Sequence, residues 1–151
     1  MNYDFNIGTI DSLQHVATLD VWWKEMVQIG IITAGFDGEL NDRGTQLLRD
    51  TLDEGDWIFA YASGHGYIGA GLAEKPETYM LHNTPSPFNH LTTHLHERKV
   101  KWLFYIDNLA NAINAHSIGV SHPAQAMQRM DNDKVKTVLQ AFFNNQSVIA
   151  A

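Results

Sequence analysis

Residues 55–72 read GDWIFAYASGHGYIGAGL, and this stretch carries the strongest evidence for the fold class. Two short apolar runs flank a Ser-Gly-His-Gly connection at residues 63–66, a pattern that predicts a β-hairpin. If Ala62 pairs with Tyr67, one face of the hairpin carries the bulkier residues Trp57, Phe59, Tyr61, Ile68, Ala70 and Leu72. The other face carries Ile58, Ala60, Ala62, Tyr67, Gly69 and Gly71. Strand glycines are typical of places where a backbone or a flat ligand approaches the sheet closely.

The bulk composition is that of a globular protein. The 151 residues suffice for a sizeable core, and we expect residues 1–151 to form a single domain. Hydrophobic residues make up 44% and charged residues 18% of the chain. No apolar run approaches the roughly 18 residues of a membrane span, and the start lacks the features of a secretory signal. Because cysteine is absent, disulfides and thiolate sites are excluded, and we expect a cytoplasmic protein.

The net charge of −7 is spread unevenly. Residues 1–77 hold 13 Asp/Glu against 4 Lys/Arg, a balance of −9, whereas residues 78–151 have a balance of +2 and six of the eight histidines. The overall sign argues against tight, sequence-blind binding to nucleic acid, which depends on cations that contact phosphates. Arg98, Lys99 and Lys101 form either a local cationic surface or a solvated strand edge.

Periodicity predicts helices and strands along the rest of the chain. We expect strands at 31–36 and 99–106, and an irregular insertion at about 75–96. The expected helices run from residue 11 or 12 to about 28, near 47–52, over 108–115 after a cap at Asp107, and from the turn at 121–123. A last helix is predicted from the stripe Val135, Val138, Leu139 and Phe142. The tail after Asn145 is expected to fray.

Strands and helices mix without βαβ regularity, which indicates an α+β domain around a small curved sheet. Segments 30–36 (GIITAGF), 54–61 (EGDWIFAY) and 64–71 (GHGYIGAG) resemble, in that order, the EVE-type branch of the PUA-like superfamily, which is related to YTH and ASCH domains. Segments 101–105 (KWLFY) and 121–125 (SHPAQ) continue the resemblance, which spans about residues 28–130. It implies a PUA-like pseudobarrel of mixed and antiparallel strands with flanking helices.

Related domains accept a flipped, often modified base in a pocket, and the resemblance implies such a pocket beside the hairpin and the 121–125 turn. The pocket needs an aromatic wall for stacking and polar groups for the base edge. The candidate ligand-binding residues are Trp22, Thr33, Phe36, Ser63, His65, Tyr67, Trp102, Tyr105, Ser121 and Gln125. The candidate phosphate contacts are Arg98, Lys99, Lys101 and Arg129. Each aromatic has a core role as its alternative, and Ser121 has a helix-capping role.

The histidines His90, His94 and His96 are the candidate ligands for a metal, since two of them are spaced i, i+4. Nearby prolines argue against a helix here, so we expect no metal and no cofactor. A histidine cluster that becomes positive below about pH 6.5 is the other interpretation. The motifs of serine hydrolases, P-loop proteins and zinc proteases are absent, so we expect no enzyme, with an ASCH-type or histidine-metal enzyme as a lesser alternative.

The sequence therefore predicts a domain that reads a nucleobase, modified or not, in an aromatic-walled pocket. Its expected partner is nucleic acid or a modified nucleotide. We expect no association with a membrane. The alternative is an acidic protein-interaction or nucleic-acid-mimic module, for example one related to phage or restriction systems. In that alternative the acidic first half of the chain meets a basic protein.

Overall fold

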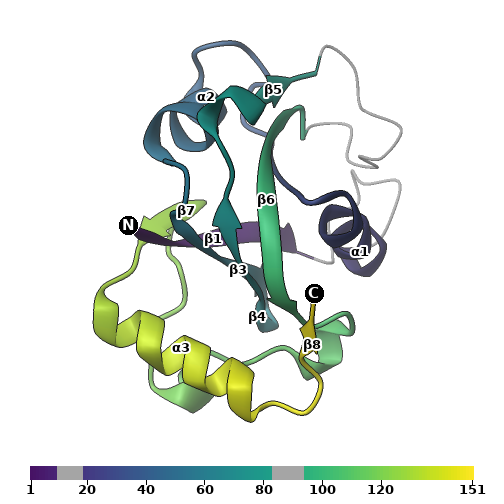
Figure 1. Cartoon of the computed structure of the whole chain (residues 1–151), viewed down its shortest axis with the longest axis vertical. Coiled ribbons are helices and arrows are strands. Elements are labelled where there is room, and N and C mark those ends of the chain that lie inside the picture. The colour runs from purple at the N-terminus through teal and green to yellow at the C-terminus, as the bar shows by residue number, and fades with distance from the viewer. Residues whose placement is uncertain (10–18, 83–93) are drawn as a thin grey trace.

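A computed structural model gives the fold and describes residues 1–9, 19–82 and 94–151. Within these ranges the strands form one curled, mixed sheet (Figure 1). In chain order they are β1 (Asn2–Thr9), β2 (Ile31–Ala34), β3 (Trp57–Ser63), β4 (Gly66–Ala73), β5 (Met80–Leu81), β6 (His96–Tyr105), β7 (Met127–Arg129) and β8 (Ile149–Ala150). Their order is β2-β6-β4-β3-β1-β7, with β5 and β8 paired to β6. β1 runs parallel to β3, and the other pairs are antiparallel.

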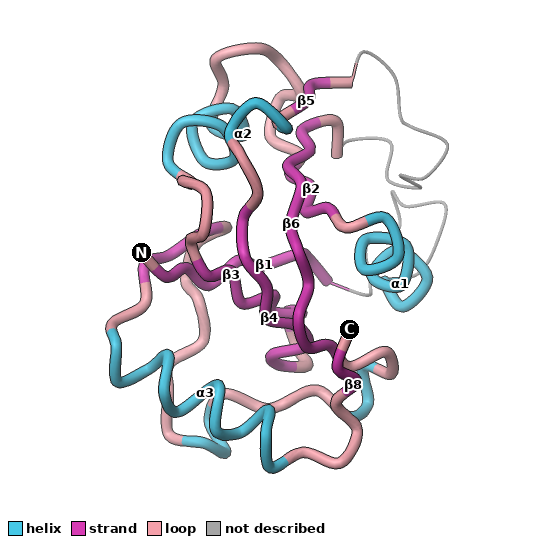
Figure 2. The backbone as a smooth tube through the Cα atoms, in the orientation of Figure 1, coloured by secondary structure: helices cyan, strands magenta, loops and turns pink. Residues whose placement is uncertain are grey.

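Helical segments surround this sheet (Figure 2). They are α1 (Leu19–Ile29), α2 (Arg43–Thr45), a π-helical turn (Gln46–Thr51), α3 (Asn132–Asn144) and 3-10 turns at Pro76–Thr78, Leu109–Asn111 and His116–Ile118. α3 confirms the predicted C-terminal helix, because its buried residues are three of the four in the stripe. α1 confirms the later part of the first predicted helix, and residues 10–18 lie outside the described ranges. The α+β class is confirmed.

β3 and β4 form the predicted hairpin with a change of register near the turn. Trp57 pairs with Leu72 as expected, but a bulge places Tyr61 opposite Tyr67 and Ala62 opposite Gly66. The predicted pair of Ala62 with Tyr67 is therefore wrong by one residue. Since a one-residue shift moves a side chain to the other face of a strand, Tyr67 joins Tyr61 and Ile68 joins the small-residue face.

The two faces of the hairpin carry separate apolar clusters. The cluster on the small-residue face combines Ile58, Ala60, Ala62 and Ile68 with Trp22, Trp23 and Met26 of α1. The cluster on the bulky face combines Phe59, Tyr61, Tyr67 and Ala70 with Val135, Val138 and Phe142 of α3. Helices α1 and α3 thus cover opposite faces of the central strands, as Figure 1 shows.

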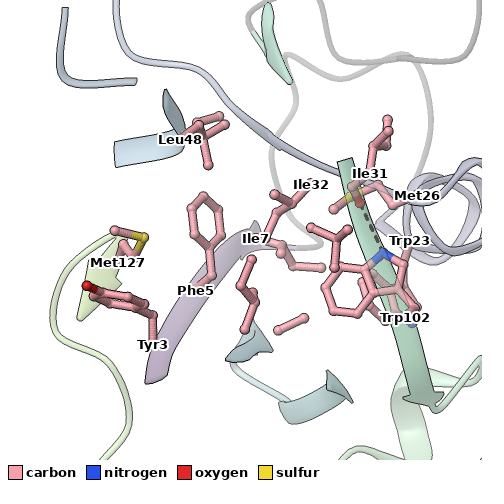
Figure 3. Packing of buried hydrophobic residues seen from close by; sticks show 14 of the residues in the cluster. Tyr3, Phe5, Ile7, Trp23, Met26, Ile31, Ile32, Leu48, Trp102 and Met127 are labelled. Atoms are coloured by element: carbon pink, nitrogen blue, oxygen red, sulfur yellow. Dashed lines mark hydrogen bonds between the residues drawn. The ribbon is translucent and has the colours of Figure 1, made fainter. Parts of the chain in front are cut away.

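The narrow cleft predicted beside the glycine-lined face is filled by the protein's own side chains. A Cβ atom added at Gly69 would lie 2.5 Å from Cη2 of Trp23, so the glycine makes room for that indole ring. The rings of Trp23 and Trp102 meet edge to face with centroids 5.0 Å apart (Figure 3). Their Nε1 groups donate to the carbonyls of Ile106 and Ile31, at 2.8 and 3.1 Å. The prediction of a ligand cleft at this place is therefore wrong.

Three further predictions of local structure are wrong because distant pairing overrides local preference. The tail does not fray, since Ile149 and Ala150 pair with the end of β6. The turn at 121–123 leads into β7, which pairs with β1, and no helix follows it. The stretch 108–115 contains only the 3-10 turn, because Ile113 exchanges two backbone hydrogen bonds with Tyr67, of 2.9 and 3.0 Å.

Candidate functional site

The curl of the sheet brings β1 close to β2, although several strands separate them in the sheet order. A cavity of about 470 Å³ opens between the two strands, and we call it the β1–β2 cavity. Its volume lies within the roughly 300–1,000 Å³ of typical small-molecule sites. From β1 it is lined by Phe5, Asn6, Ile7 and Gly8. From β2 and the loop after it come Thr33, Ala34, Gly35 and Phe36, and His94 and Ala126 complete the lining.

A β-bulge in β1 shapes one wall of this cavity. Asn6 pairs with Tyr61 and Gly8 pairs with Ala62, so Ile7, which lies between Asn6 and Gly8, has no paired residue on β3. Gly8 has a φ of +117°, which favours glycine at this position. The Gly8 N–H donates to Oδ1 of Asn6 at 2.9 Å. This bond fixes which end of the Asn6 amide faces Gly8, and the other end carries the Nδ2 amino group, a hydrogen-bond donor.

The opposite wall carries a polar pair. The Thr33 hydroxyl lies 3.3 Å from Nδ1 of His94, within hydrogen-bond distance. The His94 ring in turn meets the Trp22 ring edge to face, with centroids 4.6 Å apart. Thr33 and Trp22 are almost completely buried, so they fix the position of the more exposed imidazole. Thr33 and His94 thus form a polar wall that the packing behind them holds in place.

Phe36 is the exposed aromatic residue of the cavity. It is 45% exposed, whereas most large apolar residues in the described part of the chain are buried. Its backbone has a φ of +53°, the left-handed region, which costs a bulky residue about 1–2 kcal/mol. Residues held in such a conformation concentrate at ligand sites. The ring at this edge provides a flat surface on which a planar ligand can stack.

Asp42 holds the loop that carries Phe36. The donors to its carboxylate are the backbone N–H groups of Asp37, Glu39, Gly44 and Thr45, at 2.8–3.3 Å, and Nε2 of His96 lies 2.8 Å from Oδ1. Burial acts to raise the pKa of the Asp42 carboxyl, but hydrogen bonds from Glu39, His96 and Thr45 outweigh burial and keep the pKa below its usual range. The charged Asp42 carboxylate therefore holds both ends of the loop, at residues 37–39 and at residues 44–45.

We expect Asp42→Ala to lower the free energy of unfolding by about 2–3 kcal/mol at pH 7, because several backbone donors lose their acceptor. The native pKa of Asp42 lies below the unfolded value of about 3.9, so the stabilisation is complete above that value and is lost as the pH falls through the native pKa. Urea unfolding of wild type and variant should thus show a smaller difference at pH 3 than at pH 7. Asp50→Ala, which removes an exposed ion pair with Arg49, is the control. An equal effect of the two variants would contradict the role of Asp42.

Three of the predicted ligand-binding residues meet at the β1–β2 cavity. Thr33 and Phe36 line it, and Trp22 supports it through His94. Trp102 and Tyr67 lie in the two apolar clusters instead, and Tyr67 donates to Asp4 Oδ1 at 2.7 Å. Tyr105 borders a different cavity of about 380 Å³ beside α1.

The remaining predicted ligand residues are not in the lining of the cavity. Ser63 and His65 lie at the tip of the hairpin, where the His65 N–H donates to the Ala62 carbonyl. Ser121 and Gln125 are exposed, and Gln125 directly precedes the lining residue Ala126. The 121–125 turn therefore contributes to the cavity only through Ala126, and the described lining contains no residue of the hairpin tip.

The four predicted phosphate contacts do not form one surface. Arg98 is fully buried and donates to the carbonyls of Leu48, Leu52 and Glu74, a position that does not fit a phosphate contact. Lys99 is half-buried, and Lys101 is exposed and borders another cavity. Arg129 borders a polar depression next to Met1.

The histidines are not gathered into a metal centre in the described part of the chain. His94 contacts Thr33 and Trp22, whereas Nδ1 of the buried His96 bonds to Tyr79 Oη at 2.7 Å. His90 lies outside the described residues. Among residues 1–9, 19–82 and 94–151, no three His, Cys, Asp or Glu side chains form a group able to hold a metal ion.

Sequence reasoning missed Asn6 and Gly8, because the strand β1 was not predicted. The signal was present, since Tyr3, Phe5 and Ile7 alternate with polar residues at the strand period of two. Ala126 had no such signal, because only the pairing of β7 with β1 brings it to the cavity. None of the helices in the described ranges is long and apolar enough to span a membrane.

Comparisons with known proteins identify the fold. No protein-family model matches the sequence, and no curated protein matches it significantly. The YTH domain of the Zygosaccharomyces rouxii MRB1 protein, solved in complex with N6-methyladenosine RNA, is similar with a TM-score of 0.59 and 16% identity, over 97% of this chain and 90% of that chain. Protein PSPTO5229 from Pseudomonas syringae is similar with a TM-score of 0.52 and 14% identity, over 93% and 99% of the two chains.

These similarities show that the chain has a YTH-like fold, in which the curled sheet forms a half-barrel flanked by helices. The predicted PUA-like pseudobarrel is thereby confirmed. The resemblance to the EVE-type branch within this superfamily stays a prediction, because the similar structures do not distinguish the branches.

Proposed function

We propose that this protein binds a nucleobase of a nucleic acid, in modified form, in the β1–β2 cavity. The observation that carries the proposal is the exposed ring of Phe36 at a cavity whose other walls present Asn6, Thr33 and His94. The similar YTH domain was solved with N6-methyladenosine RNA, which supports a ligand of this class. The cavity is not the cleft predicted from the hairpin glycines, and it lies instead at the open seam of the half-barrel.

The chemistry of the walls suits a flat heterocycle. One face of a base stacks on Phe36, and each such stacking contact contributes about 1–3 kcal/mol. The amino group of Asn6 donates to a ring nitrogen or carbonyl at the base edge, and Thr33 and His94 supply further polar contacts. Phe5 and Ile7 provide apolar surface at which a methyl group displaces water.

We also propose binding without catalysis. Among the described residues that line the cavity, His94 is the only ionisable side chain, and Asn6 and Thr33 are the other polar ones. These three side chains supply hydrogen-bond donors and acceptors for a base edge. The walls of the cavity therefore favour recognition over reaction.

The test replaces the stacking ring. We expect Phe36→Ala to weaken binding of a short N6-methyladenosine-containing RNA about tenfold or more, measured by tryptophan fluorescence or calorimetry at low salt. Phe143→Ala is the matched control, because Phe143 is a 63% exposed phenylalanine on α3, on the other side of the sheet. A panel of modified and unmodified RNA and DNA oligonucleotides run in parallel identifies the preferred base.

Two results would count against this function. If no oligonucleotide or nucleoside binds at low salt, the cavity does not read a base. If both phenylalanine variants lose binding equally, the ligand does not stack on Phe36. Salt-dependent binding of a basic protein, without any nucleic acid, would instead favour the acidic interaction module.

A further inference from the structure

No Lys or Arg side chain is part of the described lining of the β1–β2 cavity. All ten Lys and Arg residues fall within the described ranges, and none of them lines the cavity. Arg98 is buried, Arg49 pairs with Asp50, and Lys134 pairs with Asp4. The sequences of residues 10–18 and 83–93 contain no Lys or Arg, so they add no permanent cation. A phosphate held at this cavity would therefore meet no Lys or Arg in its walls.

Negative charge, by contrast, lies next to the exposed ring. Asp37 follows Phe36 directly, Glu39 lies two residues further on, and both are exposed. Within the described part of the chain, neither carboxylate takes part in an ion pair or a side-chain hydrogen bond. This differs from Asp42, whose carboxylate is taken up by the loop and by His96. The two exposed charges are thus not neutralised by a neighbouring side chain in the described part of the chain.

The loop that carries these carboxylates is held against the cavity. Its backbone N–H groups at Asp37 and Glu39 donate to Asp42 at 3.1 Å. A Cβ atom added at Gly38 would lie 2.9 Å from Cδ1 of Leu95, the neighbour of the lining residue His94. The backbone of residues 37–39 is therefore held in place directly after Phe36, and neither Asp37 nor Glu39 is itself part of the cavity lining.

Electrostatics then ranks the ligands by charge. Asp37 directly follows Phe36 in the chain, and charges closer together than the Debye length of about 8 Å at physiological ionic strength are only partly screened. Carboxylates at this distance attract a cation and repel a phosphate. The face of an aromatic ring also attracts a cation, by about 0.5–1 kcal/mol at an exposed site. Both effects at Phe36 favour positive charge on the stacked ring.

We infer that the β1–β2 cavity takes a nucleoside whose base carries a positive charge through ring N-methylation, in preference to its neutral isomer and to its 5′-phosphate. The inference rests on the proposed base-binding function and names the ligand class of that same site. It follows from the position of Asp37 and Glu39 beside Phe36, together with the absence of Lys and Arg from the described lining.

The test uses isomers that differ in charge. N1-methyladenosine is protonated and positively charged at neutral pH, whereas N6-methyladenosine is neutral, and apart from that one proton the two nucleosides contain the same atoms. At pH 7.5 and low salt we expect N1-methyladenosine to bind about five- to tenfold more tightly by calorimetry. We expect the 5′-monophosphate of each nucleoside to bind more weakly than the nucleoside itself. Raising NaCl to 0.5 M should reduce both differences.

Charge-neutral variants assign the effect to the carboxylates. The double variant Asp37→Asn with Glu39→Gln should bind the two isomers with similar affinity, whereas Asp107→Asn should keep the preference. Asp107 is the matched control, because it is an exposed carboxylate that borders a different cavity. If the double variant still prefers N1-methyladenosine, the role of these two charges is overturned. The preference would then come from contacts with the edge of the base.

The outcomes separate this inference from the function on which it rests. If both isomers bind equally, or the neutral one binds more tightly, and Phe36→Ala weakens that binding, the base site stands and the charge preference is overturned. If the 5′-phosphates bind more tightly than the nucleosides, the charge preference is likewise overturned. If neither isomer and no oligonucleotide binds, the proposed function fails and this inference fails with it.

Discussion

Arg98→Met is expected to destabilise the protein by about 3–5 kcal/mol, since buried carbonyls left without a donor cost about 1–3 kcal/mol each. The Arg98 side chain is fully buried on β6. Its Nη1 donates to the carbonyls of Leu48 and Leu52, and its Nη2 donates to the Glu74 carbonyl at 2.6 Å. Methionine fills much of the same volume but donates no hydrogen bond. Three carbonyls at the end of the π-helical turn and after β4 would therefore lose their donor.

Urea unfolding with global fluorescence detection measures this loss. Lys101→Met is the matched control, because Lys101 is a neighbouring cation on the same strand whose side chain is exposed. We expect the control to change stability by less than about 0.5 kcal/mol, as is usual for exposed positions. If Arg98→Met keeps wild-type stability but loses affinity for RNA, Arg98 contacts the ligand and its structural role is wrong.

Lys134→Met is expected to cost about 3–5 kcal/mol at pH 7, because it leaves a buried carboxylate without its cation. Asp4 on β1 is fully buried and accepts from Nζ of Lys134 at 2.6 Å and from the Tyr67 hydroxyl at 2.7 Å. Burial raises the pKa of the Asp4 carboxyl, and the hydrogen bonds from Lys134 and Tyr67 act against that rise. The pair joins α3 to β1, the strand next to the edge strand β7, so its loss weakens the packing of α3.

The pH dependence of this loss has a definite sign. Without Lys134, the native pKa of Asp4 rises further above the unfolded value of about 3.9. A carboxyl group with a raised native pKa favours folding when protonated and loses that contribution as the pH rises through the native pKa. The deficit of Lys134→Met relative to wild type should therefore be smaller at pH 4 than at pH 7 in urea unfolding.

The control for this prediction removes the charge on the other partner as well. The double variant Asp4→Asn with Lys134→Met should be more stable at pH 7 than Lys134→Met alone, because asparagine carries no charge and still accepts from Tyr67. If the double variant is no more stable, the cost of Lys134→Met comes from lost packing of its side chain and not from the unpaired carboxylate.

Elements with strong local patterns were predictable from the sequence. The apolar stripe of α3 and the part of the hairpin away from its turn, from the pair Trp57–Leu72 to the pair Ala60–Gly69, follow from side-chain spacing. In each of these segments only one arrangement buries the apolar face. The order of short segments also indicated the PUA-like pseudobarrel, which the similarity to the YTH domain confirms. The register near the hairpin turn was not predictable, because the bulge at Ile68 depends on what packs against each face.

The candidate site was predictable only in part. Thr33 and Phe36 were identified through the resemblance, and both line the β1–β2 cavity. The glycine-lined cleft was wrong because Trp23, from a helix far away in sequence, occupies it. A sequence shows that small residues leave space, but it does not show which other side chain fills that space.

By itself, the sequence determined the α+β class, the hairpin and the surplus of acidic residues, because composition and period act locally along the chain. Tertiary structure alone decided that Arg98 lies inside and that β1 closes against β2 to leave a cavity beside Phe36. The physical reason is the curl of the sheet, which brings together two strands that are not hydrogen-bonded partners and that three other strands separate in the sheet order.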